Sequence, residues 1–108
     1  MLHSDAIRTI VQRIVHAAHA PRKVILFGSY ANDSANEHSD LDLLVVEKEV
    51  PHMPSEYNRL RGAIGPIGIG VDVLIYKSDE FEKRKNWQTS PVFDAVRTGK
   101  VMYEYDAG

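Results

Sequence analysis

Apolar and polar positions follow two different periods along this chain. Between residues 5 and 19, apolar residues recur every three or four positions, which is the spacing of an amphipathic helix. Four short runs, rich in apolar residues, are typical of strands. These runs are residues 23–27, 40–46, 71–76 and 100–105. Helical spacing returns between the later runs and predicts three more helices, at 55–63, 78–86 and 91–98.

The order of these elements predicts an α/β fold, a small mixed β-sheet flanked by helices. A helix joins the second strand to the third, so we expect these two strands to be parallel. A short connection joins the first strand to the second, so we expect that pair to be antiparallel. The end of the first strand and the starts of the other two then share one edge of the sheet. The length of 108 residues fits one domain, residues 1–108.

Three aspartates fall at this predicted edge. Asp40 and Asp42 alternate at the start of the second strand and therefore point to the same face. Asp72 opens the third strand in the same way. Aspartate is depleted in strands, and two carboxylates about 4 Å apart repel by roughly 4 kcal/mol at an effective dielectric of about 20. Because Mg²⁺ prefers oxygen ligands and combines carboxylates with substrate phosphates, the pattern predicts a magnesium site.

The first strand ends in Gly28-Ser29, which supplies a complementary feature. Gly28 permits close approach of the backbone, and Ser29 offers a hydroxyl and an N–H at the start of a predicted short helix, residues 29–35. A lone Asp-x-Asp pair is often a solvated strand end, and a lone Gly-Ser pair is usually a turn. Their coincidence at one edge favours a site that binds a nucleotide through its phosphates and a metal.

The composition of the chain argues against several kinds of binding site and against a membrane span. The formal charge of −2 argues against binding of an extended nucleic acid, which requires a basic excess. There is no cysteine, so thiolate metal sites are excluded, and the five histidines offer no third zinc ligand in sequence. The glycine-rich segment 62–70 precedes a strand, so it predicts a mobile connection rather than a dinucleotide fingerprint. No apolar run is long enough to span a membrane, and we expect a cytoplasmic protein.

The combination of Gly28-Ser29, Asp40-x-Asp42 and the later acid in "VDV" resembles the nucleotidyltransferase superfamily of the DNA polymerase β type. More narrowly, it is similar to the minimal nucleotidyltransferases (MNT) encoded beside HEPN-domain proteins, some of which form toxin–antitoxin pairs. The resemblance extends over "VILFGSYA", "SDLDLLVV", "VDVLIY" and "AVRTGKVMYE", which is most of the chain.

The resemblance implies roles for individual residues. Asp40 and Asp42 would bind two Mg²⁺ ions, and Asp72 would complete the site and help to deprotonate an acceptor hydroxyl. Gly28 and Ser29 would hold the β- and γ-phosphates of a nucleoside triphosphate, expected to be ATP. The acceptor would be carried by a separate HEPN-domain helical partner, in some pairs a tyrosine that receives the adenylyl group.

One departure from the family pattern lies beside the phosphate turn. Many relatives continue as G-S-x-A-R-G, whereas this chain has Asn32 and Asp33 where the arginine and glycine would stand. The basic run 83–85 is a candidate for compensation, although a solvated helix face explains it as well. Two alternatives therefore stay open: an antitoxin that acts by binding alone, and a two-component transferase that modifies a small molecule.

Overall fold

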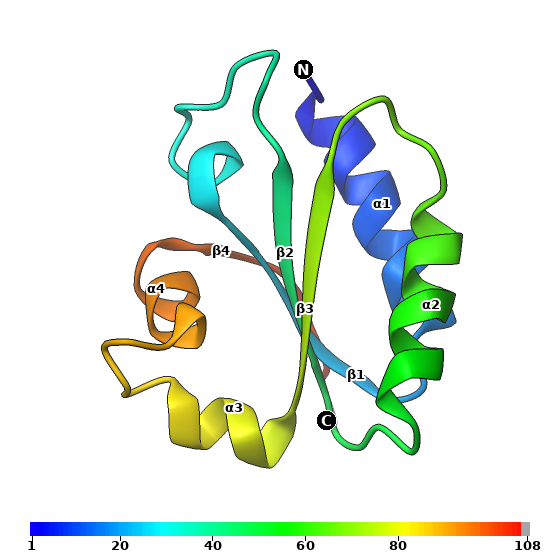
Figure 1. Ribbon diagram of the computed structural model, residues 1–108, viewed down its shortest axis with the longest axis vertical. Coiled ribbons are helices and arrows are strands. Elements are labelled where there is room, and N and C mark those ends of the chain that lie inside the picture. The colour runs from blue at the N-terminus through cyan, green and yellow to red at the C-terminus, as the bar shows by residue number, and fades with distance from the viewer. Residues whose placement is uncertain (107–108) are drawn as a thin grey trace.

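The computed structural model describes residues 1–106, which form a four-stranded mixed sheet with helices on both faces (Figure 1). The strand order is β3-β2-β1-β4, in which β1 is antiparallel to β2 and β4, and β2 is parallel to β3. The elements are α1 (Ser4–Ala17), β1 (Pro21–Phe27), the 3-10 turn η1 (Gly28–Tyr30), β2 (Leu41–Glu47), α2 (Met53–Ile64), β3 (Val71–Lys77), α3 (Ser78–Arg84), α4 (Pro91–Thr98) and β4 (Lys100–Glu104). The predicted α/β fold and strand directions are confirmed.

Most elements begin and end within two residues of their predicted bounds, and two of the differences have local causes. The predicted helix at 29–35 is only the short turn η1, because Asp33 adopts a left-handed backbone conformation with a φ of 61°. Helix α2 begins two residues early, at Met53. Pro54 is accommodated in its first turn, where a missing N–H costs nothing, and His52 caps the helix by accepting from Ser55 N.

Two apolar clusters hold helices to the two faces of the sheet. One face packs against α1 and α2 through side chains such as Ile14, Leu43 and Leu60. The other face packs against α3 and α4 through Leu44 and Phe81. Residues alternate between these clusters along β2, as the two-residue period of a strand requires. In residues 1–106, no helix is long and apolar enough to cross a membrane.

Candidate active site

The central feature of the candidate site is a pair of facing carboxylates. Asp42 of β2 stands directly opposite Asp72 of β3 in the parallel register, and the Asp72 side chain lies close enough to raise the pKa of Asp42. Asp42 is half-buried and Asp72 is exposed. Both lie in phase with residues that pack against α3 and α4, so they project from that face at the upper end of the strands in Figure 1.

The crowding of acids changes the proton affinity of Asp42. Its pKa rises from 3.8 to about 6, mainly because burial disfavours the charged form. Interaction with the Asp72 side chain and the negative charges of Asp72 and Asp40 raise the pKa further. Protonation of Asp42 below about pH 6 therefore reduces the repulsion between the acids, whereas at neutral pH the charged form is destabilised.

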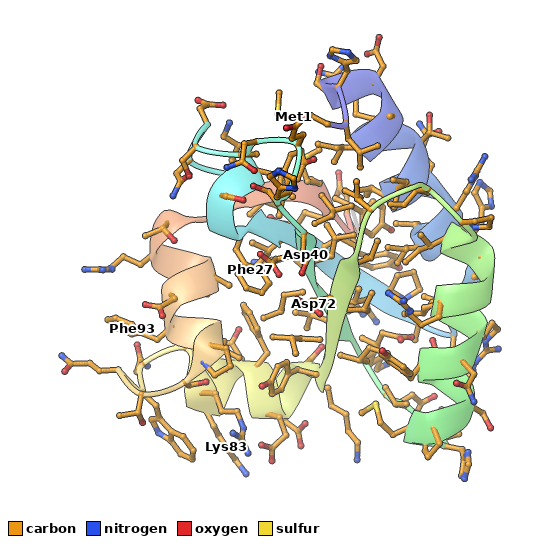
Figure 2. All side chains as sticks on the ribbon, turned by 45° about the horizontal axis from the view of Figure 1, so that its top comes forward. Met1, Phe27, Asp40, Asp72, Lys83 and Phe93 are labelled. Carbon is orange, nitrogen blue, oxygen red and sulfur yellow. The ribbon has the colours of Figure 1, made fainter. Side chains whose placement is uncertain are left out.

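Asp40 lies apart from this pair, one residue before β2. Its side chain is exposed, and its carboxylate rests against the α-carbon of Gly70: a Cβ added to Gly70 would lie 2.4 Å from Asp40 Oδ1. The backbones meet there too, because Leu41 N donates to Gly70 O over 2.9 Å. Figure 2 shows Asp40 and Asp72 at the same end of the sheet, near Phe27. The three acids therefore share one edge, as the strand order predicts, with Asp42 and Asp72 in contact.

The Gly-Ser turn directly adjoins the facing pair. Gly28 has a φ of 73°, a conformation that favours glycine, and a Cβ at this position would lie 2.3 Å from Asp42 Oδ2. Sequence reasoning missed how the turn is anchored: Tyr30 is buried, and its hydroxyl accepts a hydrogen bond from Leu2 N at 3.2 Å. An aromatic residue directly after the Gly-Ser pair was the available signal.

The basic run 83–85 lies at the wrong end of the molecule to help bind phosphate. Helix α3 follows the C-terminal end of β3, whereas Asp72 is near its N-terminal end, and Figure 2 shows Lys83 far from Asp40 and Asp72. Arg84 pairs with Glu80, and Lys85 pairs with Glu82. These contacts agree with the solvated helix face that the sequence also suggested.

The donor chemistry of the edge fits a magnesium ion. The carboxylates of Asp42 and Asp72 lie at adjacent positions of neighbouring strands, and Gly28 lets the backbone approach Asp42 closely, because a Cβ at position 28 would overlap the Asp42 carboxylate. Among residues 1–106, no three acidic or histidine side chains are gathered closely enough to form a complete metal site. A site built here would therefore take its remaining ligands from Asp40 at the same edge, from water or from substrate phosphates. The assignment of all three aspartates as metal ligands stays a prediction.

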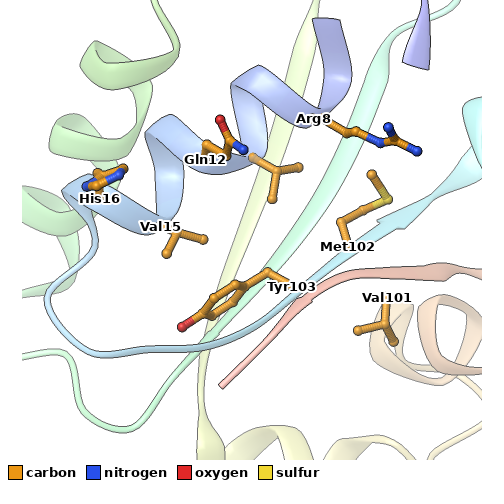
Figure 3. A pocket seen from close by; sticks show the side chains of 8 residues that line it. Arg8, Gln12, Val15, His16, Val101, Met102 and Tyr103 are labelled. Atoms are coloured by element: carbon orange, nitrogen blue, oxygen red, sulfur yellow. The ribbon is translucent and has the colours of Figure 1, made fainter. Parts of the chain in front are cut away.

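A separate groove of about 530 Å³ lies between α1 and β4 (Figure 3). Val15, Met102 and Tyr103 supply apolar surface, and Arg8 and His16 also line it. None of the three aspartates lines this groove, and it opens beside α1, whereas Asp42 and Asp72 project from the face that packs against α3 and α4. The groove is therefore not part of the candidate active site.

Comparison with known proteins supplies the family. The family model described as a nucleotidyltransferase domain matches residues 5–101 of the chain. The chain belongs to this nucleotidyltransferase family. Two relatives from Methanocaldococcus jannaschii are named protein adenylyltransferases. This nucleotidyltransferase is 28% identical to MJ0604 over 76% of its length and 78% of the relative's, and 30% identical to MJ1305 over 77% of its length and 58% of the relative's.

A solved structure supports the same fold. The crystal structure titled as a toxin–antitoxin with AMP-PNP matches with a TM-score of 0.67 and 17% identity, over 97% of this nucleotidyltransferase and 76% of the solved chain. At this identity the likeness concerns the fold, and it bears out the expected polymerase β-like architecture. The family match establishes the enzyme class, a nucleotidyltransferase, which the sequence predicted.

The raised pKa of Asp42 predicts how stability depends on pH. The folded state holds the proton on Asp42 more tightly than the unfolded state does. This proton therefore adds to the free energy of unfolding in full below pH 3.8, and its contribution is lost as pH rises through about 6. The pKa difference of about two units corresponds to about 3 kcal/mol in a site without water. Because Asp42 is partly exposed to water, we expect the free energy of unfolding to fall by about 1–2 kcal/mol. Urea unfolding at pH 4.5 and pH 7 measures it. The same comparison in Asp42→Asn should lack this component; an unchanged pH dependence would contradict the assignment.

Proposed function

We propose that the chain is a Mg²⁺-dependent adenylyltransferase of the cytoplasm, which transfers AMP from ATP to a hydroxyl on a separate HEPN-type helical protein. In this proposal the partner is a toxin, the acceptor is a tyrosine, and the chain is the antitoxin. The observation that carries the proposal is the contact between Asp42 and Asp72 directly beside Gly28. It places negative charge for a cation directly beside the Gly-Ser turn, whose backbone N–H groups would hold phosphate.

Each residue has a defined task in this reaction. Asp40, Asp42 and Asp72 would supply carboxylate oxygens to the cation, which when bound would neutralise phosphate charge and orient the α-phosphate. The backbone at Gly28 and Ser29 holds the terminal phosphates. Asp72 accepts the proton of the acceptor hydroxyl as the oxygen attacks the α-phosphorus. One O–P bond forms, the bond between the α- and β-phosphates breaks, and pyrophosphate leaves.

The identity of the nucleotide and acceptor is supported by similar proteins. The relatives named protein adenylyltransferases favour ATP as donor and a protein as acceptor. The solved toxin–antitoxin with AMP-PNP has the same fold, which favours an adenine nucleotide and a toxin partner. These names describe the other proteins, and their transfer to this chain is part of the proposal.

A runner-up function is neutralisation of the partner by binding alone. The observation that favours it is the phosphate turn itself, where Asp33 is exposed and carries a negative charge in place of the family pattern. This alternative predicts that Asp40→Asn/Asp42→Asn still neutralises the partner fully in a growth assay. The proposal of catalysis predicts that this double variant no longer protects the cell.

The direct test uses ATP labelled in two positions. The chain is incubated with Mg²⁺ and the protein encoded beside its gene, with label on either the α- or the γ-phosphate. Adenylyl transfer places the α-label on the partner and releases the γ-label in pyrophosphate, whereas phosphorylation would do the reverse. Mass spectrometry of the partner locates the adduct. Absence of α-label on the partner, with label on an added small hydroxyl compound, would support the two-component alternative instead.

A further inference from the structure

Gly70 has an unusual environment for a residue at the end of a loop. It lies directly before β3, and Leu41 N donates to its carbonyl oxygen over 2.9 Å. This bond continues the parallel ladder of β2 and β3 by one step, so that Gly70 stands opposite Asp40. The position is therefore fixed by backbone pairing, although the segment before it is rich in glycine.

The space above the α-carbon of Gly70 is filled by the Asp40 carboxylate. A Cβ at Gly70 would lie 2.4 Å from Asp40 Oδ1, 2.9 Å from Cγ and 3.3 Å from Oδ2. These separations are well inside van der Waals contact, so any side chain at position 70 displaces the carboxylate. The backbone itself does not require glycine here, because the positive-φ glycines are Gly28, Gly65 and Gly68. Glycine at position 70 serves the neighbouring acid rather than the turn.

We propose that Gly70 is a positioning residue that reserves the place of the Asp40 carboxylate at the mouth of the site. The inference rests on the proposed function, in which Asp40 helps to bind the divalent cation. It extends to Asp40 the arrangement at Gly28, where a Cβ would meet Asp42. Two of the three acids thus pack against a glycine: Asp42 against the turn after β1, and Asp40 against the loop before β3.

The test compares Gly70→Ala with Gly62→Ala. Gly62 lies in α2, has no positive φ and has no atom within 4 Å of an added Cβ, so it is a matched control. Mn²⁺ binding to the full chain is followed by electron paramagnetic resonance, without nucleotide. We expect the Kd of Gly70→Ala to rise at least fivefold and that of Gly62→Ala to stay within twofold of wild type. Wild-type affinity in Gly70→Ala would overturn the inference.

A second measurement does not depend on the metal or on activity. Melting temperatures are recorded in EDTA for Gly70→Ala, Asp40→Ala and the double variant. If Gly70→Ala acts by crowding Asp40, it lowers the melting temperature alone but has no further effect once Asp40 is alanine. The same comparison applies if Gly70→Ala folds poorly, because the double variant then regains the fold. A double variant as unstable as Gly70→Ala would overturn the inference.

The two measurements separate failure of this inference from failure of the proposed function. If wild type itself does not bind Mn²⁺, the proposed metal-dependent function fails, and the melting comparison still decides whether Gly70 positions Asp40. If wild type binds Mn²⁺ and Gly70→Ala binds it equally well, the proposed function stands and the role of Gly70 is wrong.

Discussion

Asp42→Asn is expected to reduce adenylyl transfer by about 10²–10³-fold while raising the melting temperature of the protein. The loss follows from the proposed function, because the amide removes one negative charge from the proposed cation site, where electrostatic stabilisation of the reaction would be largest. The gain in stability follows because Asp42 is half-buried, and because the charges of Asp72 and Asp40 also oppose its ionisation. An amide of nearly the same shape relieves that repulsion. Opposite effects on activity and stability are characteristic of a functional carboxylate.

Label transfer from α-labelled ATP and thermal melting at pH 7 measure the two effects. Asp79→Asn is the matched control, because Asp79 opens α3 beyond the C-terminal end of β3, away from Asp72. It should leave the rate within about twofold of wild type. If Asp42→Asn kept full activity, the facing carboxylates would not form the active site. If it lost activity by unfolding, the electrostatic account of Asp42 would be wrong.

The convergence of acids could be predicted because it depends only on strand order and side-chain period. A helix between β2 and β3 requires those strands to be parallel, and a parallel pair brings Asp42 opposite Asp72. The short connection after β1 then brings Gly28 to the same edge. Local patterns thus determine which backbone positions meet, and the structure bears out that part of the sequence analysis.

Contacts between side chains and distant backbone could not be predicted in this way. The Asp40 carboxylate can pack against the backbone of Gly70 only because Gly70 has no Cβ. The sequence shows only that this loop is rich in glycine. The anchoring of the turn through Tyr30 and Leu2 joins residues 28 positions apart. The basic residue Lys83 looked like a possible phosphate ligand until the direction of β3 placed it at the far end. Each of these needs three-dimensional packing, which spacing alone does not supply.

The largest stability effects are expected from two glutamates buried at the opposite end of the sheet from the acids. Glu47 is 0% exposed at the end of β2, and Glu56 is 1% exposed in α2. They accept hydrogen bonds from consecutive backbone amides in the α1–β1 connection: Ala20 N donates to Glu47 Oε1 at 3.0 Å, and His19 N donates to Glu56 Oε2 at 2.9 Å. Both side chains therefore fasten the same connection to the core.

The carboxylates of Glu47 and Glu56 differ in whether their second oxygen has a hydrogen-bond partner. Glu56 Oε1 pairs with Arg59, so each of its oxygens has a partner. Glu47 Oε2 is buried and, within the described residues, has no hydrogen-bond partner. Burial raises the pKa of Glu47 above its ordinary value. The charge on Glu47 is thus a cost to the fold, whereas the charge on Glu56 is compensated.

Replacement of each glutamate by glutamine should consequently change stability in opposite directions. At pH 7, Glu47→Gln keeps an oxygen for Ala20 N and removes a buried charge, so the free energy of unfolding should rise by about 1 kcal/mol. Glu56→Gln leaves either His19 N or Arg59 without its carboxylate oxygen, and the free energy should fall by about 2–3 kcal/mol. Urea unfolding of both variants measures the difference, with each serving as the isosteric control for the other.

The pH dependence of the Glu47→Gln gain distinguishes charge from packing as its cause. Because the pKa of Glu47 is raised in the folded state, wild type takes up a proton there as pH falls, and its side chain becomes neutral like glutamine. The advantage of Glu47→Gln must therefore shrink as pH falls from 7 towards the ordinary glutamate pKa of 4.5. A gain that stays constant as pH falls would show that the amide stabilises the fold through a new hydrogen bond, and that removal of the buried charge is not the cause of the gain.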